Sequence, residues 1–194
     1  MPLQETLRFL SSFFNRPHVV GAVAPSSAGL ARRMVEWIDW PNLQAVVEYG
    51  PGTGSFTRAI LEAKRRESRC FAIELEPAFV AILKRRFPGV VVHQDSVANV
   101  RALCDREGIE QVDAIISGLP WAAFPESLQT QFLDAAMSVL KPGGQFVTFA
   151  YLQGLLLPAG KRFRRMLQRY FAEVGTSGVV WFNLPPAFVY RCRR

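Results

Sequence analysis

The sequence predicts an α/β fold in which a mostly parallel sheet is covered by helices on both faces. From residue 45 onward, short runs rich in β-branched residues alternate with segments of helical period. The runs are almost continuously apolar, as in strands that are buried on both faces. A Gly-rich turn follows the first run and opens the first helical segment. The expected strands are 45–49, 69–74, 90–93, 113–117 and 145–151, and the expected helices are 54–65, 77–86, 97–107 and 125–140.

The C-terminal part of the chain completes the predicted sheet. The sequence Lys-Pro-Gly-Gly at 141–144 indicates a helix stop and a turn before the fifth strand. A basic helix over 159–170 follows, and then two apolar runs, 178–182 and 187–192. We expect these runs to form a closing antiparallel pair at the sheet edge, which brings the total to seven strands.

Two helices are expected before the sheet. The first is amphipathic over residues 3–14, and the second spans 28–38 with Ser26 or Ser27 as its N-cap. The apolar face of the first helix consists of Leu3, Leu7, Leu10 and Phe14, widened by Phe9 and Phe13. Because the chain shows no internal repeat or low-complexity linker, we expect one domain over 1–194, with the helices in 1–40 and the core in 41–194.

Composition excludes several classes of protein. The chain has 194 residues, of which 49% are apolar and 20% charged, as in a globular domain and unlike a disordered or fibrous one. The longest apolar stretch, 146–157, is too short for a membrane span, and no signal peptide is expected. Three dispersed cysteines and two histidines predict neither disulfides nor a metal site. We therefore expect a reduced cytoplasmic protein.

The positive charge is concentrated at the C-terminus. The net charge is +7, and residues 161–194 contain eight basic side chains and one acidic side chain, which accounts for all of it. Five of the basic residues lie between Lys161 and Arg169. Such a segment either faces an anion, for example a lipid surface or a nucleic-acid backbone, or is a solvated helix face.

The strongest motif is the Gly-rich loop at 48–54, Glu-Tyr-Gly-Pro-Gly-Thr-Gly. Three glycines between a strand and a helix allow a tight turn and a close approach of the backbone to a ligand. A dinucleotide fingerprint requires a further glycine at 55 or 57, and a Walker loop requires a lysine after Gly54; neither is present. The pattern resembles the first motif of the class I methyltransferases that use S-adenosylmethionine (AdoMet).

Two acidic positions follow the next strands. Glu74 ends the second strand, 20 residues after Gly54, where a carboxylate binds ribose hydroxyls in nucleotide-binding folds. Its alternative is a surface ion pair with a nearby arginine. Asp95 and Ser96 follow the third strand. In the methyltransferase pattern an acid here accepts from the adenine amine, and as a lone residue it is a helix N-cap; the two roles are compatible.

The fourth motif is Ser117-Gly118-Leu119-Pro120-Trp121, directly after the fourth strand. It resembles the Asn-x-Pro-Tyr or Asp-Pro-Pro-Tyr loop of amino-methyltransferases, which lies beside the transferable methyl group. The carbonyl groups of Ser117 and Gly118 would accept from an amine, and the proline and the aromatic ring would position it. The alternative is a strand-end turn that a buried Trp121 caps.

Taken together, these motifs resemble the class I methyltransferases, which have a Rossmann-like, seven-stranded, mostly parallel sheet. Two flanking segments, 21–32 and 181–190, resemble those of the bacterial phospholipid N-methyltransferases, which are related to the rRNA adenine dimethylases. At position 117 this chain has serine, where the dimethylase motif has a residue with a polar side-chain amide. The resemblance implies transfer of methyl groups from AdoMet to the headgroup amine of phosphatidylethanolamine and its methylated derivatives, towards phosphatidylcholine.

The resemblance also implies the site residues. Amine positioning falls to Ser117, Gly118, Leu119 and Trp121. An ethanolamine amine must lose a proton before it attacks, and an apolar setting near Trp121 and Phe124 favours that loss. Tyr49, Tyr190 and His18 are candidate bases by chemistry alone, and each is otherwise a packing residue. The expected cofactor contacts are Ser26, Ser27, Glu48, Gly50, Gly52, Gly54, Glu74, Leu75, Asp95, Ser96 and Ser117.

The expected partner is an anionic membrane surface on the inner face of the membrane, contacted through helix 3–14 and the 161–169 cluster. The alternative is that helix 3–14 caps the cofactor pocket. Two other functions remain open. The first is adenine N6-dimethylation of RNA, and the lack of an added RNA-binding domain after the sheet argues against it. The second is a non-catalytic membrane-binding protein, and the intact glycine motif argues against that.

Overall fold

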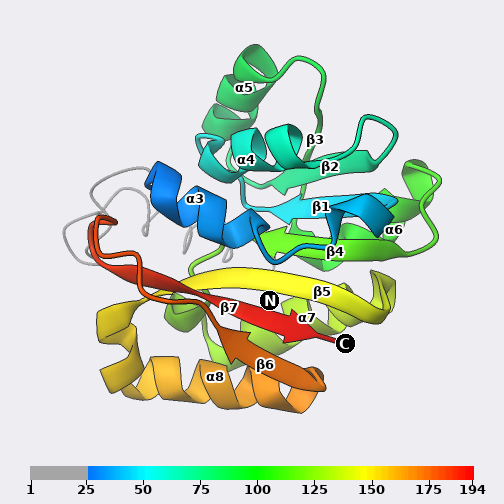
Figure 1. Ribbon diagram of the computed structural model, residues 1–194. Helices are drawn as coiled ribbons and strands as arrows, with labels where there is room; N and C mark the ends of the chain where they lie inside the picture. Colours follow the sequence, from blue (N-terminus) through cyan, green and yellow to red (C-terminus); the bar gives the residue numbers. More distant parts are fainter. Residues whose placement is uncertain (1–25) are drawn as a thin grey trace.

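The computed structural model describes residues 26–194, whose strands form one seven-stranded sheet (Figure 1). The strand order is β3-β2-β1-β4-β5-β7-β6. Strands β1 to β5 pair in parallel, and β7 runs antiparallel to both of its neighbours. The strands are β1 (Ala45–Tyr49), β2 (Arg69–Glu74), β3 (Val91–Gln94), β4 (Val112–Ser117), β5 (Leu140–Tyr151), β6 (Glu173–Thr176) and β7 (Ala187–Arg193). The predicted Rossmann-like, mostly parallel sheet is confirmed.

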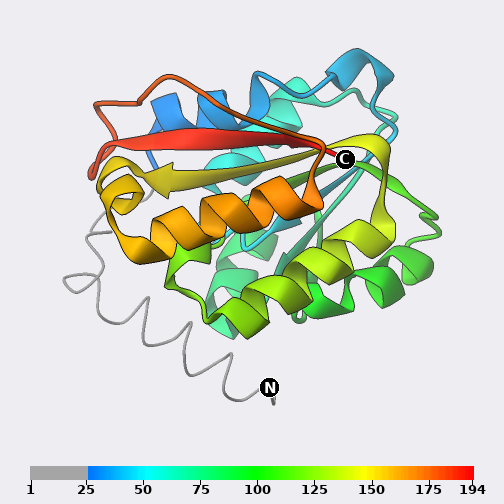
Figure 2. The ribbon, with the colours of Figure 1, turned by 90° about the horizontal axis from the view of Figure 1, so that it is seen from below.

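The helices lie in two layers, one on each face of the sheet (Figure 2). Helices α3, α4 and α5 cover one face, and α6, α7 and α8 cover the other. The α-helices are α3 (Ala28–Val35), α4 (Ser55–Ala63), α5 (Pro77–Arg86), α6 (Val100–Arg106), α7 (Glu126–Val139) and α8 (Pro158–Tyr170). Four short 3₁₀ helices connect them: η1 (Trp40–Asn42), η2 (Val97–Asn99), η3 (Trp121–Ala123) and η4 (Leu152–Leu156).

Strand β1 shows why the central strands are mostly apolar. All five of its residues are buried. Because successive side chains of a strand point to opposite faces, Val46 packs among α3 and α4 residues while Val47 packs in the core beneath α6 and α7. Glu48 is the polar exception, and it lies on the α4 face, where the Thr57 hydroxyl donates to its Oε2 over 2.7 Å.

The closing antiparallel pair differs from the prediction. The partner of β7 is β6, at Glu173–Thr176, whereas residues 178–182 form a loop with a single bridge between Val180 and Ala187. An edge strand has one neighbour and little burial, and β6 is mostly exposed. Its short polar sequence therefore lacks the apolar run by which strands are predicted, while the apolar run 178–182 has another placement, described below.

Smaller differences concern element ends. The predicted helix over 97–107 is divided into η2 and α6, and β5 begins at Leu140, before the expected turn, with an irregular register against β4. Helix α3 ends at Val35 instead of residue 38. Its N-cap is Ser27, whose hydroxyl oxygen accepts from the Leu30 N–H at 3.2 Å.

The carboxyl ends of β1, β2, β4 and β5 meet at one edge of the sheet, where the loops after these strands gather. In parallel α/β sheets ligands bind outside this edge. Among the helices of residues 26–194, none is both long and apolar enough to cross a membrane.

Candidate active site

The Gly-rich loop after β1 is built on positive φ angles. Gly50, Gly52 and Gly54 have φ values of 62°, 56° and 90°, a region that residues with side chains rarely adopt. A Cβ on Gly50 would lie 2.5 Å from the Leu119 side chain, which would have to move, so this contact adds to the positive φ in favouring glycine. A Cβ on Gly52 meets no atom of the described residues within 4 Å. The backbone of Gly52 therefore borders an open space at the sheet edge.

Glu74 closes one side of this space. Its Oε2 accepts from the Gly52 N–H at 2.9 Å, and its Oε1 accepts from the backbone N–H groups of Leu75 at 2.8 Å and Glu76 at 3.0 Å. The side chain is buried, and burial raises the pKa of the carboxyl group, which these three N–H groups partly offset. An ionised carboxylate has about four acceptor positions, so one position on Oε2 remains for a ligand hydroxyl.

Asp95 and Ser96 lie after β3, and the Asp95 N–H donates to the Glu74 carbonyl oxygen at 3.2 Å. Asp95 Oδ1 accepts from the Ser96 N–H and from the Asn99 side-chain amide, both at 2.7 Å. The Ser96 hydroxyl oxygen accepts from the Ala98 N–H at 3.3 Å and caps η2. The N-cap is therefore Ser96 and not Asp95, whose carboxylate instead accepts from the Ser96 N–H and the Asn99 amide. The Asp95 Oδ2 atom accepts no hydrogen bond from residues 26–194.

The loop after β4 lies against the glycine loop. The Gly118 N–H donates to the Tyr49 carbonyl at 2.7 Å, and a Cβ on Gly118 would lie 2.6 Å from the Gly50 carbonyl oxygen. The Ser117 carbonyl is already engaged, because it accepts from the Thr148 hydroxyl at 3.1 Å. The Gly118 carbonyl accepts from no residue in 26–194. Of the two carbonyl groups that the sequence indicated, Gly118 is the one available to an amine.

Trp121 lies in the core below this loop and is 1% exposed. Its Nε1 donates to the Ser117 hydroxyl oxygen at 2.9 Å, which also accepts from the Leu119 N–H at 3.3 Å. Its ring stacks on Phe163 of α8 at a centroid distance of 5.4 Å. The ring edges and faces of further aromatic residues enclose it: Phe124, Phe132 and Phe146. Trp121 therefore shapes the loop through Ser117, and its proposed part in positioning the amine remains a prediction.

The three candidate bases fall into different places. The Tyr49 hydroxyl is buried and has no hydrogen-bond partner in residues 26–194, and burial raises its pKa well above the usual value. Tyr190 lies in the aromatic cluster, edge-on to Phe163, and burial raises its pKa as well. Both phenols are thus held neutral. His18 lies outside the described residues, as does helix 3–14.

Glu48 is 1% exposed, and its pKa is raised to about 8 by burial, with the Thr57 hydrogen bond acting in the opposite direction. Its Oε1 has no partner in residues 26–194. The side chain lies under α4, on the face opposite to Tyr49. Its hydrogen bond from Thr57 joins β1 to α4, and direct contact with a cofactor remains a prediction.

Ser26 and Ser27 lie at the start of α3. The Ser27 N–H donates to Asn183 Oδ1 at 3.0 Å, across a separation of 156 residues. Asn183 is buried, and its side-chain amide donates to the Pro185 carbonyl at 2.7 Å. This contact joins the two segments that flank the core, and sequence reasoning did not foresee it. The only signal was that both segments contribute to the same family resemblance.

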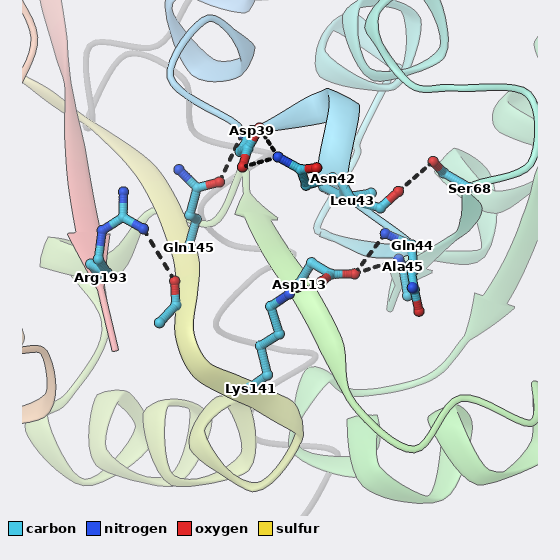
Figure 3. Close-up of polar contacts among 11 residues, drawn as sticks. Asp39, Asn42, Leu43, Gln44, Ala45, Ser68, Asp113, Lys141, Gln145 and Arg193 are labelled. Carbon is cyan, nitrogen blue, oxygen red and sulfur yellow. Dashed lines mark hydrogen bonds and ion pairs between the residues drawn. The ribbon is translucent and has the colours of Figure 1, made fainter.

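A second polar cluster lies at the opposite edge of the sheet, around the amino ends of β1 and β4 (Figure 3). Asp113 Oδ2 accepts from the N–H groups of Gln44 at 2.8 Å and Ala45 at 2.7 Å, and its Oδ1 pairs with Lys141. Gln145 Oε1 accepts from the Asp39 N–H at 2.9 Å. Because these groups pair with one another, the cluster joins the strands and offers little to a ligand. Among residues 26–194, no three Cys, His, Asp or Glu side chains gather as a metal site.

The groups at this edge suit a nucleoside by their chemistry, because Glu74 has an acceptor position left for ribose hydroxyls and Asp95 Oδ2 has one left for an adenine amine. Contact of the cofactor with these residues remains a prediction. A buried carboxylate with a free acceptor position and a backbone without a side chain suit such a ligand better than a metal ion.

Comparison with known proteins identifies methyltransferases as the similar proteins. A family model described as a methyltransferase domain matches residues 46–144. An ornithine lipid N-methyltransferase of Singulisphaera acidiphila is 33% identical over 194 residues, covering 98% of this chain and 97% of the relative. An AdoMet-dependent methyltransferase from Archaeoglobus fulgidus has the same fold, with a TM-score of 0.63 and 13% identity over 94% of this chain and 99% of the other.

An rRNA methylase from Streptococcus thermophilus matches with a TM-score of 0.60 and 14% identity, covering 85% of this chain and 94% of the other. At these identities the structural matches establish the fold alone, while the family model and the full-length relative establish the family. From its sheet order, its glycine loop and these matches, the chain belongs to the class I AdoMet-dependent methyltransferases.

Proposed function

We propose that this enzyme methylates the headgroup amine of a membrane lipid, with phosphatidylethanolamine and its methylated derivatives as substrates. The observation that carries the lipid class is the relative that matches over almost the full length of both chains, an ornithine lipid N-methyltransferase. Both candidate substrates present an amine at the end of a lipid headgroup. The flanking segments 21–32 and 181–190 favour the phosphatidylethanolamine group, as the sequence analysis indicated.

The geometry suits attack by an amine. AdoMet, when bound, supplies a methyl group on a positively charged sulfur, which a neutral amine attacks in line. The Gly118 carbonyl lies on the loop that contacts Gly50, beside the open space above Gly52. An amine that donates an N–H to this carbonyl has its lone pair directed away from the loop. Fixing the nucleophile in this way supplies a large part of the rate in a bimolecular transfer.

The amine must also lose its proton. The reference pKa of an alkylamine is about 10.4, and transfer from water into an apolar setting lowers it. Leu119 and Phe124 are buried apolar residues of the segment that follows β4, and they contribute such a setting. The phenols of Tyr49 and Tyr190 are held neutral by burial, which argues against either as the proton acceptor. Because neither phenol is suited to accept the proton, we infer that the amine releases it to water before it enters the site.

We further propose that the enzyme acts as a peripheral protein at the inner face of the membrane. Exposed basic residues of α8 supply attraction to anionic lipids, each worth roughly 1 kcal/mol near such a surface. Helix 3–14 remains a candidate second contact. Transient binding suits an enzyme that must exchange its soluble cofactor and release its lipid product.

The test is methyl transfer from radiolabelled AdoMet to vesicles of defined composition. One set contains phosphatidylethanolamine, a second contains ornithine lipid, and a third reaction contains adenine-rich RNA instead of vesicles. We expect labelled mono- and dimethylated phosphatidylethanolamine, with Gly52→Val as the inactive control. Label in ornithine lipid alone would correct the headgroup, and label in RNA alone would overturn the proposal.

A further inference from the structure

Exposed apolar side chains gather at one end of the molecule. In the described part of the chain six large apolar residues are exposed, and five of them lie in two segments: η4 with the start of α8, and the loop before β7. We call these five residues the apolar rim. They are Leu156 (80% exposed), Leu157 (55%), Trp181 (64%), Phe182 (95%) and Leu184 (74%).

The two segments of the rim are neighbours in space. The Leu152 N–H, at the start of η4, donates to the Pro186 carbonyl at 2.8 Å, and Tyr151 at the end of β5 pairs with Ala187 at the start of β7. Figures 1 and 2 both show η4 and the loop before β7 at the same end of the sheet. Because β5 is parallel to β1 and β4, this end is also the edge that carries the loops of Gly52 and Gly118.

The polarity of the loop is inverted. Asn183 is 4% exposed, while its neighbours Phe182 and Leu184 are 95% and 74% exposed. The inward position of Asn183 is fixed by its hydrogen bonds to Ser27 and to Pro185. The polar side chain of the loop thus forms hydrogen bonds within the protein, while its apolar side chains are exposed. Contiguous exposed apolar side chains of this kind mark an interaction surface.

A strongly basic helix adjoins the rim. Helix α8 begins directly after Leu157, contains no acidic residue, and buries Phe163, Met166 and Leu167. Its exposed positions carry five cations: Lys161, Arg162, Arg164, Arg165 and Arg169. Apolar side chains next to clustered cations complement an anionic lipid surface, where the former enter the headgroup region and the latter remain among the headgroups.

A second copy of the chain is a poorer occupant. A symmetric contact would bring two identical basic helices together, and like charges at an interface oppose association. The position of the rim also favours a bilayer as the partner. If this edge of the sheet contacts the membrane, the Gly118 loop faces the plane of the headgroups.

We propose that the apolar rim inserts into anionic membranes, with Trp181, Phe182 and Leu184 below the headgroups, and that it orients the active site toward lipid amines. The orienting role rests on the proposed lipid substrate; the insertion itself is tested without catalysis.

Trp181 provides the readout. The chain has four tryptophans, and Trp121 is buried while Trp37 and Trp40 are partly buried. The full-length protein is mixed with phosphatidylglycerol–phosphatidylcholine vesicles that carry brominated acyl chains, which quench tryptophans only at acyl-chain depth. We expect quenching in the parent protein and its loss in Trp181→Phe. Vesicle binding without quenching of Trp181 would overturn the proposal.

Sedimentation with the same vesicles measures the contribution of the rim. Phe182→Ser with Leu184→Ser should weaken binding roughly tenfold or more, since each parent side chain is worth one to two orders of magnitude when transferred out of water. Val91→Ser is the matched control, because Val91 is 44% exposed on β3, at the other side of the sheet. Equal binding by the double variant would overturn the proposal, as would a change from dimer to monomer in solution, which would identify a second copy as the occupant.

The failure of the two proposals is distinguishable. Quenching of Trp181 without methylation of any lipid amine contradicts the proposed function and leaves the insertion surface in place. Lipid methylation without quenching of Trp181 contradicts the insertion surface alone.

Discussion

The carboxylate of Glu74 and the backbone of Gly52 are joined by a hydrogen bond of 2.9 Å, in which the Gly52 N–H donates to Oε2. The end of β2 thus holds the glycine loop that follows β1, in the position where a ligand would contact both. The geometry is set before the cofactor arrives, and less ordering is needed on binding.

Replacement of Glu74 tests the cofactor site. Glu74→Ala should weaken AdoMet binding by roughly 1–3 kcal/mol, because hydrogen bonds to a charged acceptor are lost together with the anchor of the glycine loop. Isothermal titration calorimetry measures the affinity. Glu76→Ala is the control, since the Glu76 side chain lies next to Glu74 and makes no hydrogen bond in the described chain. Unchanged affinity for Glu74→Ala would remove this residue from the site.

Two glycines should respond differently to a methyl group. Gly52→Ala places its Cβ in open space and costs only the strain of a positive φ, about 1–2 kcal/mol, while Gly52→Val fills ligand space and removes AdoMet binding. Gly118→Ala brings its Cβ to 2.6 Å from the Gly50 carbonyl, so the loop must shift. A displacement near 1 Å costs about 100-fold in rate. We expect Gly118→Ala to lower kcat strongly and AdoMet affinity little; equal losses in both would place the loop in the cofactor site.

Trp121 should separate stability from catalysis. Trp121→Ala removes a fully buried ring and should cost about 3–5 kcal/mol in the free energy of unfolding. Trp121→Phe keeps most of the packing and removes the Nε1 bond to Ser117. We expect Trp121→Phe and Ser117→Ala to slow methyl transfer to a similar degree with little change in AdoMet affinity. If Trp121→Phe transfers methyl groups at the parental rate, Trp121 is a packing residue.

The parts of the fold that were predictable are those that local sequence encodes. The bounds of β1 and β2 agree with the structure because the buried parts of parallel strands are mostly apolar, and the glycine loop is recognisable because its φ angles exclude most other residues. The pairing of β7 with β6 was not predictable. Glu173–Thr176 is a polar edge strand whose conformation depends on a partner.

The residues proposed to contact the ligands were predictable from the sequence, whereas the residues that hold them in place were less so. The positions of Glu74 and Gly118 follow from the ends of strands. The burial of Trp121 depends on Phe163 of α8, which returns to the sheet 42 residues later along the chain. The bond between Ser27 and Asn183 joins residues that lie at opposite ends of the sequence. The hydrophobic periodicity of a short segment does not reveal contacts between residues so far apart in the sequence.

Glu48 should make stability depend on pH. Its pKa of about 8 in the folded protein is above the value of 4.5 for an unperturbed carboxyl, so the folded state holds one proton more than the unfolded state between these pH values. Its contribution to stability is complete below pH 4.5 and is lost as the pH rises through about 8. Glu48→Gln removes this dependence and keeps an acceptor for the Thr57 hydroxyl.

Urea unfolding of both proteins from pH 5 to pH 8.5 measures the effect. We expect Glu48→Gln to gain roughly 2–4 kcal/mol relative to the parent over this range, since one pKa unit corresponds to about 1.4 kcal/mol. Glu74 remains in both proteins, and because its charge is one cause of the raised Glu48 pKa, the difference includes the coupling between the two carboxyl groups. Parallel pH profiles would show that Glu48 is ionised in the folded protein.

The basic face of α8 should give membrane binding its salt dependence. Arg162 and Arg165 are exposed on a helix without acidic residues. Replacing both by Gln should weaken binding to anionic vesicles roughly 30-fold at low ionic strength, at about 1 kcal/mol for each residue. The loss should shrink at high salt, because the screening length falls to about 3 Å at 1 M. The control is Lys84→Gln with Arg85→Gln, which removes the same charge from α5, on the other face of the sheet. If both double variants lose binding equally, net charge governs the attraction, and α8 does not form the contact.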